Sequence, residues 1–229
     1  MIGLIGGMSW ESSAEYYRII NQGIRDRRGP TASARCLLWS FDFSEIEELQ
    51  HHGDWDGLTA RMVDAANKLE TSGADVLLIC TNTMHRMAQK VQAAVGIPLL
   101  HIADPTAEKI KAAGLQKVGL LGTAFTMEHD FYKGRLAREH GLSVIVPDDE
   151  DRVTVHRIIY EELVAGKMTS ESREGFRKII ARMVKDGAEA VILGCTEIML
   201  LVQPEDCSVP IFDTTALHAN AAIEFALAE

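Results

Sequence analysis

The chain has 229 residues, of which 47% are hydrophobic and 24% are charged. This composition is ordinary for a globular protein, and the length suffices for one large domain or two small ones. The formal net charge of -10 argues against nucleic acid and anionic lipid surfaces as main partners, because both require clustered Lys and Arg.

The chain starts with MIGLIGGMSWESS, in which there is no basic leader and the first apolar run ends at a glycine pair. This start predicts a buried strand rather than a secretory signal. No later apolar stretch approaches the roughly 18 residues that a membrane span needs. The four cysteines show neither a C-x-x-C pair nor compact Cys/His spacing, so neither zinc nor a disulfide framework is indicated. We therefore expect a cytoplasmic protein without a metal centre.

Eight short apolar runs occur along the chain, and most of them are separated by helical patterns. In chain order they are IGLIG, ARCLLWSF, DVLLIC, PLLHI, KVGLLG, LSVIVP, AVILGC and VPIFD. Strands alternating with helices predict an α/β fold with mostly parallel sheets. DVLLIC and AVILGC are continuously apolar, which is typical of central strands covered on both faces.

The two halves of the chain resemble each other. Residues 2–6 match residues 118–122 at an offset of 116, and residues 73–79 match residues 187–193 at an offset of 114. Two matches in the same order and at nearly the same offset indicate an internal repeat. The alternative is that the second match is only a common way to end a helix with glycine and begin a strand.

The repeat predicts two pseudo-symmetric lobes, each a mostly parallel four-stranded sheet flanked by helices, with the active site in a cleft between them. We expect lobe 1 over residues 1–100 and lobe 2 over residues 101–213. A C-terminal helix over residues 214–229 is expected to be able to pack on lobe 1.

The second match places Thr81 opposite Cys195, and Cys80 opposite a glycine. Both segments lie where a predicted strand gives way to a helix, and open α/β sheets bind ligands outside the carboxyl ends of their strands. A helix N-terminus favours a thiolate, so Cys195 is a candidate base, with buried packing as the alternative. Side chains alternate along extended backbone, so Cys80 belongs to the core if Thr81 faces the ligand.

Four segments carry a resemblance to a known family. They are GGMSWES near the start, TNTMH after the third strand, LLGT with FTM after the fifth, and GCTE after the seventh. In this order they resemble the signature segments of the aspartate/glutamate racemase family, and most closely those of broad-specificity amino-acid racemases. The resemblance implies racemisation of aspartate or glutamate, or of a broader set of amino acids, without PLP or another cofactor, by a homodimer.

The resemblance also implies that two thiols act on opposite faces of the substrate α-carbon. Cys195 matches the second of these, whereas Thr81 stands where the family has its first cysteine. A hydroxyl is far less acidic than a thiol, whose pKa is about 8.5, so Thr81 does not hold a useful alkoxide population. We therefore expect Cys195 to be the competent base and one enantiomer to be processed preferentially.

Substrate-binding residues are expected on the turns that follow the strands, where backbone and side-chain donors suit a carboxylate. Helix capping is the alternative role of the hydroxyl residues. The candidates are Met8, Ser9, Trp10, Gln50, Asn82, Thr83, Thr123, Thr126, Thr196 and Glu197. Gln50, Arg18 and Lys167 are the candidates for binding a side-chain carboxylate of the substrate, and the sequence does not choose among them. His85 either orients a base or contributes to packing.

The same residues bear on three other functions. The spacing Gly3-x-x-Gly6-Gly7 differs from G-x-G-x-x-G, which disfavours a dinucleotide-binding enzyme. A related cofactor-free isomerase or decarboxylase of a small dicarboxylic acid stays open, because it needs protonation from one side only. A non-catalytic amino-acid-binding protein is the third alternative, since Thr81 replaces a catalytic thiol.

Overall fold

The computed structural model of the chain describes residues 1–228. Contacts between Cα atoms divide the chain into two compact units. Unit 1 contains Met1–Ile102 and the segment from Thr215 onward, and unit 2 contains Ala103–Thr214. Each unit has its own four-stranded sheet in which all neighbouring strands are parallel, so the predicted α/β fold with two such sheets is confirmed.

The sheet of unit 1 has the strand order β2-β1-β3-β4. Its strands are β1 (Ile2–Gly6), β2 (Cys36–Ser40), β3 (Val76–Ile79) and β4 (Leu99–Leu100). The central strands β1 and β3 are buried along their whole length, as their continuous apolar sequences predict.

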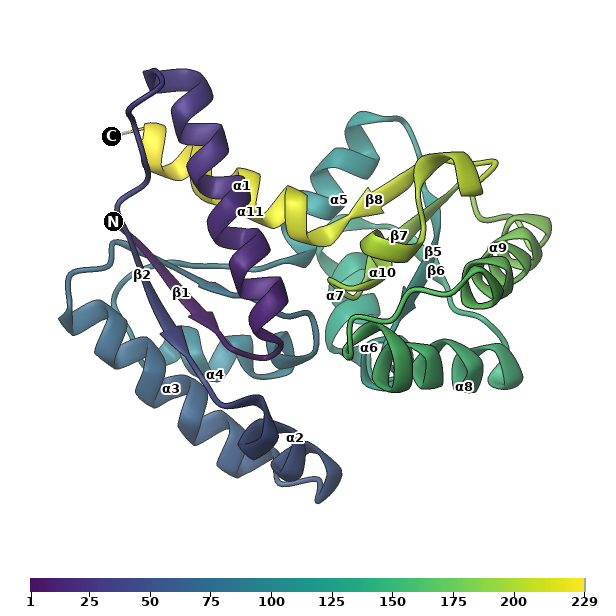
Figure 1. Cartoon of the computed structure of the whole chain (residues 1–229), viewed down its shortest axis with the longest axis horizontal. Coiled ribbons are helices and arrows are strands. Elements are labelled where there is room, and N and C mark those ends of the chain that lie inside the picture. Colours follow the sequence, from purple (N-terminus) through teal and green to yellow (C-terminus); the bar gives the residue numbers. More distant parts are fainter. Residues whose placement is uncertain (229) are drawn as a thin grey trace. The chain divides into compact units, whose positions relative to one another are not determined.

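Helices cover both faces of this sheet (Figure 1). On one face, α1 (Trp10–Arg28) and α11 (Thr214–Leu227) bury apolar side chains against β1 and β3. On the other face, α2 (Phe43–His51), α3 (Trp55–Thr71) and α4 (Ala88–Ala93) form a second apolar core with the same strands. A short 3-10 helix, η1 (Thr83–Met87), joins β3 to α4.

The sheet of unit 2 has the order β6-β5-β7-β8. Its strands are β5 (Lys117–Gly122), β6 (Ser143–Ile145), β7 (Ala190–Gly194) and β8 (Ile211–Asp213). All eight apolar runs named from the sequence therefore contain a strand.

The helices of unit 2 are α5 (Ala103–Ala112), α6 (Ala124–Glu128), α7 (Asp130–His140), α8 (Asp149–Ile158), η2 (Ile159–Leu163), α9 (Ser170–Lys185), α10 (Ile198–Leu201) and η3 (Pro204–Asp206). An apolar core joins α8, η2, α9 and α10 to β5 and β7. Over residues 1–228, no helix is both long enough and apolar enough to cross a bilayer.

The two sheets share details of hydrogen bonding, as an internal repeat predicts. Ser9 caps α1 by accepting from the Ser12 backbone N–H, and Thr123 caps α6 by accepting from the Thr126 backbone N–H. The members of the second pair lie 114 positions after those of the first. The matching strand orders and caps support two copies of one α/β motif.

Candidate active site

Each sheet has one topological switch point. From β1 the chain continues to β2 on one side, and from β3 it continues to β4 on the other, so the switch lies between the carboxyl ends of β1 and β3. In unit 2 the corresponding point lies between the ends of β5 and β7. Ligands of open α/β sheets bind at such points. Nearly all of the candidate residues follow one of these four strand ends.

The turn after β3 places Cys80 and Thr81 in different surroundings. Cys80 is fully buried in the apolar core under α1 and α11, and this burial raises the pKa of its thiol far above the ordinary range. Thr81 is only half-buried. Cys80 is thus a core residue, as alternation along the chain predicts, and Thr81 is the exposed member of the pair.

Buried polar side chains follow Thr81. Asn82 and Thr83 are only 3% and 5% exposed to solvent. His85 lies in η1 with its Nδ1 2.8 Å from the Thr81 carbonyl oxygen. The backbone on the carboxyl side of Thr81 is therefore held by a side chain of the same short helix.

The turn after β7 brings a thiol and a carboxylate into contact. The Cys195 thiol donates to Oε2 of Glu197 over 3.0 Å, and the Thr196 hydroxyl donates to the same oxygen over 2.7 Å. Cys195 and Glu197 are 9% and 6% exposed. Glu197 is therefore the hydrogen-bond acceptor of the Cys195 thiol.

Backbone N–H groups of Thr196 and Glu197 favour the Cys195 thiolate, as expected at this strand end, but larger effects outweigh them. Burial, and after it the negative charge of Glu197 and the hydrogen bond to that carboxylate, raise the pKa of Cys195 well above its ordinary value. The helix that follows, α10, has four residues and begins only at Ile198. A single helical turn has too small a dipole to offset burial, so the resting form of Cys195 is the thiol.

The turns after β1 and β5 contain capping residues. Ser9 and Thr123 are the N-caps of α1 and α6, which gives both hydroxyls a structural role. Met8 is buried at 6% exposure and Thr126 is fully buried, whereas Trp10 is 68% exposed. Of these five candidates, Trp10 is thus the one whose side chain points mainly to solvent.

Gln50 has an unusual environment on α2. Its side chain is 5% exposed, and within residues 1–228 its Oε1 accepts no hydrogen bond. Most buried polar atoms have a partner, so such an acceptor is suited to an N–H donor of a ligand.

The other two candidates for a substrate carboxylate are exposed side chains. Arg18 is exposed and its guanidinium bonds Glu15. Lys167 is exposed in the segment after η2. Residues 1–228 hold no cluster of three or more His, Cys, Asp or Glu side chains that suits a metal ion.

Sequence reasoning missed a buried cluster beside the Thr81 turn. It consists of His85, His101 and His218, with the Tyr16 hydroxyl 2.8 Å from Nδ1 of His218. Tyr16 and His218 are 202 positions apart, so no local spacing signals their contact. The contact between Cys195 and Glu197, in contrast, joins two residues of the short GCTE segment.

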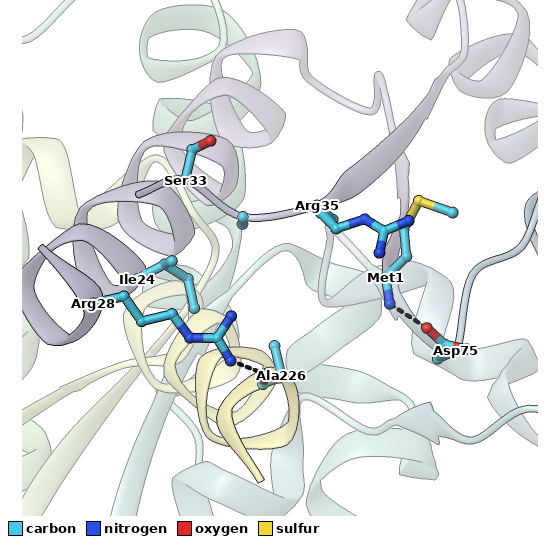
Figure 2. A pocket seen from close by; sticks show the side chains of 8 residues that line it. Met1, Ile24, Arg28, Ser33, Arg35, Asp75 and Ala226 are labelled. Atoms are coloured by element: carbon cyan, nitrogen blue, oxygen red, sulfur yellow. Dashed lines mark hydrogen bonds and ion pairs between the residues drawn. The ribbon is translucent and has the colours of Figure 1, made fainter. Parts of the chain in front are cut away.

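A hollow of about 200 Å³ lies at the opposite, amino end of β1 and β3 (Figure 2). Arg28 donates to the Ala226 carbonyl oxygen over 3.2 Å there, and the Met1 amino group bonds Asp75. The lining residues include none of the candidate site residues. This hollow is therefore separate from the switch point of unit 1.

Comparisons with known proteins agree with the sequence resemblance. The profile of the family described as "Asp/Glu/Hydantoin racemase" matches residues 5–222. The chain is 25% identical over 175 residues to the broad-specificity amino-acid racemase RacX of Bacillus subtilis, covering 76% of this chain and 75% of RacX.

Solved structures give a similar result. A Yersinia pestis protein provisionally described as an Asp/Glu racemase superposes with a TM-score of 0.93 at 53% identity, over 99% of this chain and 98% of that one. PH1733, an aspartate racemase homologue from Pyrococcus horikoshii, gives a TM-score of 0.85 at 37% identity, with 99% and 98% covered. The profile match spans most of the chain, and the chain therefore belongs to the Asp/Glu/Hydantoin racemase family.

Proposed function

We propose that this protein is a cofactor-independent amino-acid racemase that acts on aspartate or glutamate, with Cys195 and Thr81 as its two proton-transferring groups. The observation that carries the proposal is their shared position. Each residue follows the last apolar residue of a central strand by two positions, and each strand end borders the switch point of its sheet. The family membership supplies the reaction class.

On one face of the substrate, Cys195 acts together with Glu197. The Glu197 carboxylate takes the thiol proton over the 3.0 Å hydrogen bond, and the resulting thiolate removes the α-proton. The electron pair of the broken C–H bond is delocalised into the substrate carboxylate, which Asn82, Thr83 and Thr196 are proposed to bind. The Glu197 carboxylate contributes to the raised pKa of Cys195, and it is also the proton acceptor proposed for that thiol.

On the opposite face, the Thr81 hydroxyl delivers its proton to the α-carbon and recovers one from water. The proton that Glu197 took from Cys195 then neutralises the hydroxide, which returns every group to its starting form. In the reverse direction Thr81 has to act as the base, which its weak acidity makes slow. The two enantiomers have equal free energy, so kcat/KM is the same in both directions and the asymmetry is expected in kcat and KM separately.

The remaining candidates are proposed to hold the substrate. The Gln50 Oε1 is proposed to accept from the substrate ammonium group, which would satisfy this buried oxygen. The turns of Met8, Ser9 and Trp10 and of Thr123 and Thr126 are proposed to supply further contacts at the ends of β1 and β5. The protein is proposed to work as a homodimer, as its family resemblance implies.

The test is exchange of the α-hydrogen in deuterated water, followed by NMR for both enantiomers of aspartate and glutamate. We expect deuterium at the α-carbon, with different initial rates for the two enantiomers, and loss of exchange in Cys195→Ala. Equal initial rates would contradict the asymmetric roles of Cys195 and Thr81. Release of carbon dioxide would indicate a decarboxylase, and binding without exchange would indicate a binding protein.

Thr81→Cys is the informative companion variant, measured under reducing conditions. A thiol at position 81 has a pKa lower than that of a hydroxyl by several units, so kcat for the slow enantiomer should rise at least about tenfold. Thr59→Cys on α3 is the control for adding a thiol, because Thr59 does not follow β3 or β7, and it should leave kcat unchanged. An unchanged kcat in Thr81→Cys would contradict the proposed role of Thr81 in proton transfer.

A further inference from the structure

The Thr81 turn is tied to the end of unit 1 through one buried histidine. The His85 side chain is 2% exposed and reaches the Thr81 carbonyl oxygen with Nδ1 at 2.8 Å. Its other ring nitrogen, Nε2, lies 3.2 Å from the backbone nitrogen of Ile102. One imidazole thus bridges the turn after β3 and the last residue of this part of unit 1.

These two contacts determine the tautomer of His85. A backbone N–H can only donate and a carbonyl oxygen can only accept. Nε2 therefore accepts from Ile102 and has no proton, and Nδ1 has the proton and donates it to Thr81. The neutral Nδ1–H form satisfies both bonds, whereas a doubly protonated ring would oppose the Ile102 N–H.

A second histidine, His218, binds the backbone at the end of β4, two residues before Ile102. His218 Nε2 lies 2.9 Å from the Leu100 carbonyl oxygen and therefore donates to it, so its Nδ1 accepts from the Tyr16 hydroxyl at 2.8 Å. The His85 ring centroid lies 4.7 Å from that of His101 and 5.5 Å from that of His218. Ring packing and backbone bonds thus hold the His85 imidazole in one orientation.

The equivalent turn of unit 2 is built differently. Position 199, which lies 114 residues after His85, is a methionine. There the reacting side chain itself has a partner, because Cys195 bonds Glu197. In unit 1 the hydrogen bond from His85 goes to the backbone of Thr81 instead. Such a bond does not change the acidity of the Thr81 hydroxyl, but it fixes the position of the residue, and correct orientation is itself a large part of catalysis.

We propose that His85 is a positioning residue of the racemase reaction: its Nδ1–H holds the Thr81 carbonyl and so sets the direction of the Thr81 hydroxyl. The proposal rests on the proposed function. It assigns to His85 no proton transfer with the substrate. Its specific consequence is that losing the bond harms proton delivery by Thr81 and leaves proton removal by Cys195 largely intact.

The test separates two reactions of one enantiomer in deuterated water. Exchange with retention of configuration requires only Cys195, whereas racemisation requires Thr81 as well. In His85→Leu we expect racemisation to fall at least about tenfold relative to exchange with retention. A general loss of structure would lower both rates in the same proportion, so the ratio isolates positioning from folding.

Two conservative variants sharpen the test. The Asn amide places an N–H donor near Nδ1, and the Gln amide places an acceptor near Nε2. We expect His85→Asn to restore the ratio to within about threefold of the wild type and His85→Gln not to restore it. This comparison stays valid where His85→Leu fails to fold. His140→Asn on α7 is the control for a histidine substitution outside this cluster, because His140 bonds Asp104 instead of Thr81, and it should leave the ratio unchanged.

Three outcomes would overturn the proposal: equal loss of both rates in His85→Leu, rescue by Gln as good as rescue by Asn, or an unchanged ratio in all His85 variants. Failure of the proposed function looks different, because the wild-type protein would then show neither exchange nor racemisation.

Discussion

Cys195 and Glu197 form a coupled pair in which one residue changes both the acidity and the proton path of the other. Burial raises the pKa of Cys195 first, and the charge and hydrogen-bond acceptance of Glu197 raise it further. The same carboxylate accepts the hydrogen bond of the thiol over 3.0 Å and is the proton acceptor in the proposed mechanism. Its removal therefore has two opposite effects, which a pH profile separates.

Glu197→Gln should lower the pKa of Cys195, because the negative neighbour is lost, and should lower kcat by about 10²-fold, because the base is lost. The pH at which exchange by Cys195 rises is expected to move downward while its plateau falls. Peptide-resolved alkylation of Cys195 against pH measures the thiol directly. Glu205→Gln, on exposed η3, serves as the control. An upward shift or an unmoved profile would contradict this coupling.

The residue-level predictions succeeded where the repeat supplied the register. Aligning DVLLIC with AVILGC was enough to separate a core Cys80 from an accessible Thr81. The acidity of Cys195 was misjudged, because the length of α10 and the direction of the Glu197 side chain are not encoded in strand patterns. The His85–His218 cluster depends on contacts across the fold, which a single sequence does not reveal.

Helices α5 and α7 of unit 2 are joined by a charged network. Asp104 accepts from Arg135 Nε and Nη2 over 2.6 and 2.7 Å and from His140 Nε2 at 2.9 Å. Burial alone would raise the pKa of Asp104, but the hydrogen bonds and charges of Arg135 and His140 hold it below the ordinary value. The Arg135 contact is a bidentate pair, the stronger kind of ion pair.

Asp104→Asn is expected to lower the free energy of unfolding by about 1 kcal/mol at neutral pH, since the pair is only partly exposed. A folded-state pKa below the unfolded value of about 3.9 means that this stabilisation is complete above that pH and is lost as the pH falls through the folded value. Denaturation at several pH values should show the difference from wild type shrinking below about pH 4.

The matched control is Asp130→Asn, because Asp130 pairs with Arg138 on the same helix α7 but both side chains are more than 60% exposed. Little change in stability is expected for it. A difference for Asp104→Asn that grows as the pH falls would contradict the sign of the pKa shift.

Element-level structure was the most predictable part of the molecule. Each apolar run became a strand because burial on both faces of a parallel sheet leaves little choice of period or composition. Helix capping by Ser9 and Thr123 was predictable from their residue types and positions. Whether these hydroxyls also contact a substrate was not, because a capping residue can have both roles.

At the scale of the whole molecule, the helices that follow the fourth strand of each repeat belong to the other unit. Helix α5 follows β4 but belongs to unit 2, and nearly all of α11, which follows β8, belongs to unit 1. Each repeat therefore depends on the other for one covering helix.

Unit 1 also exposes apolar side chains around α1. Trp10 and Tyr17 are 68% and 52% exposed and lie seven positions apart, which puts them on one helical face. Leu38 is 45% exposed on the edge strand β2. Its Cδ1 and the Ser13 side chain of α1 both lie next to Gly6, so Leu38 is close to the first turns of α1. Apolar side chains gathered on a protein surface are typical of interaction sites.

We expect this surface to take part in the homodimer that the family resemblance implies. Tyr17→Glu should convert the protein to a monomer, because an interface that buries an unpaired carboxylate loses stability, and sedimentation equilibrium measures the mass. Val153→Glu, at a residue 69% exposed on α8, introduces the same charge elsewhere and should leave the mass unchanged. A wild-type monomer, or a Tyr17→Glu dimer as tight as the wild type, would exclude this surface as the interface.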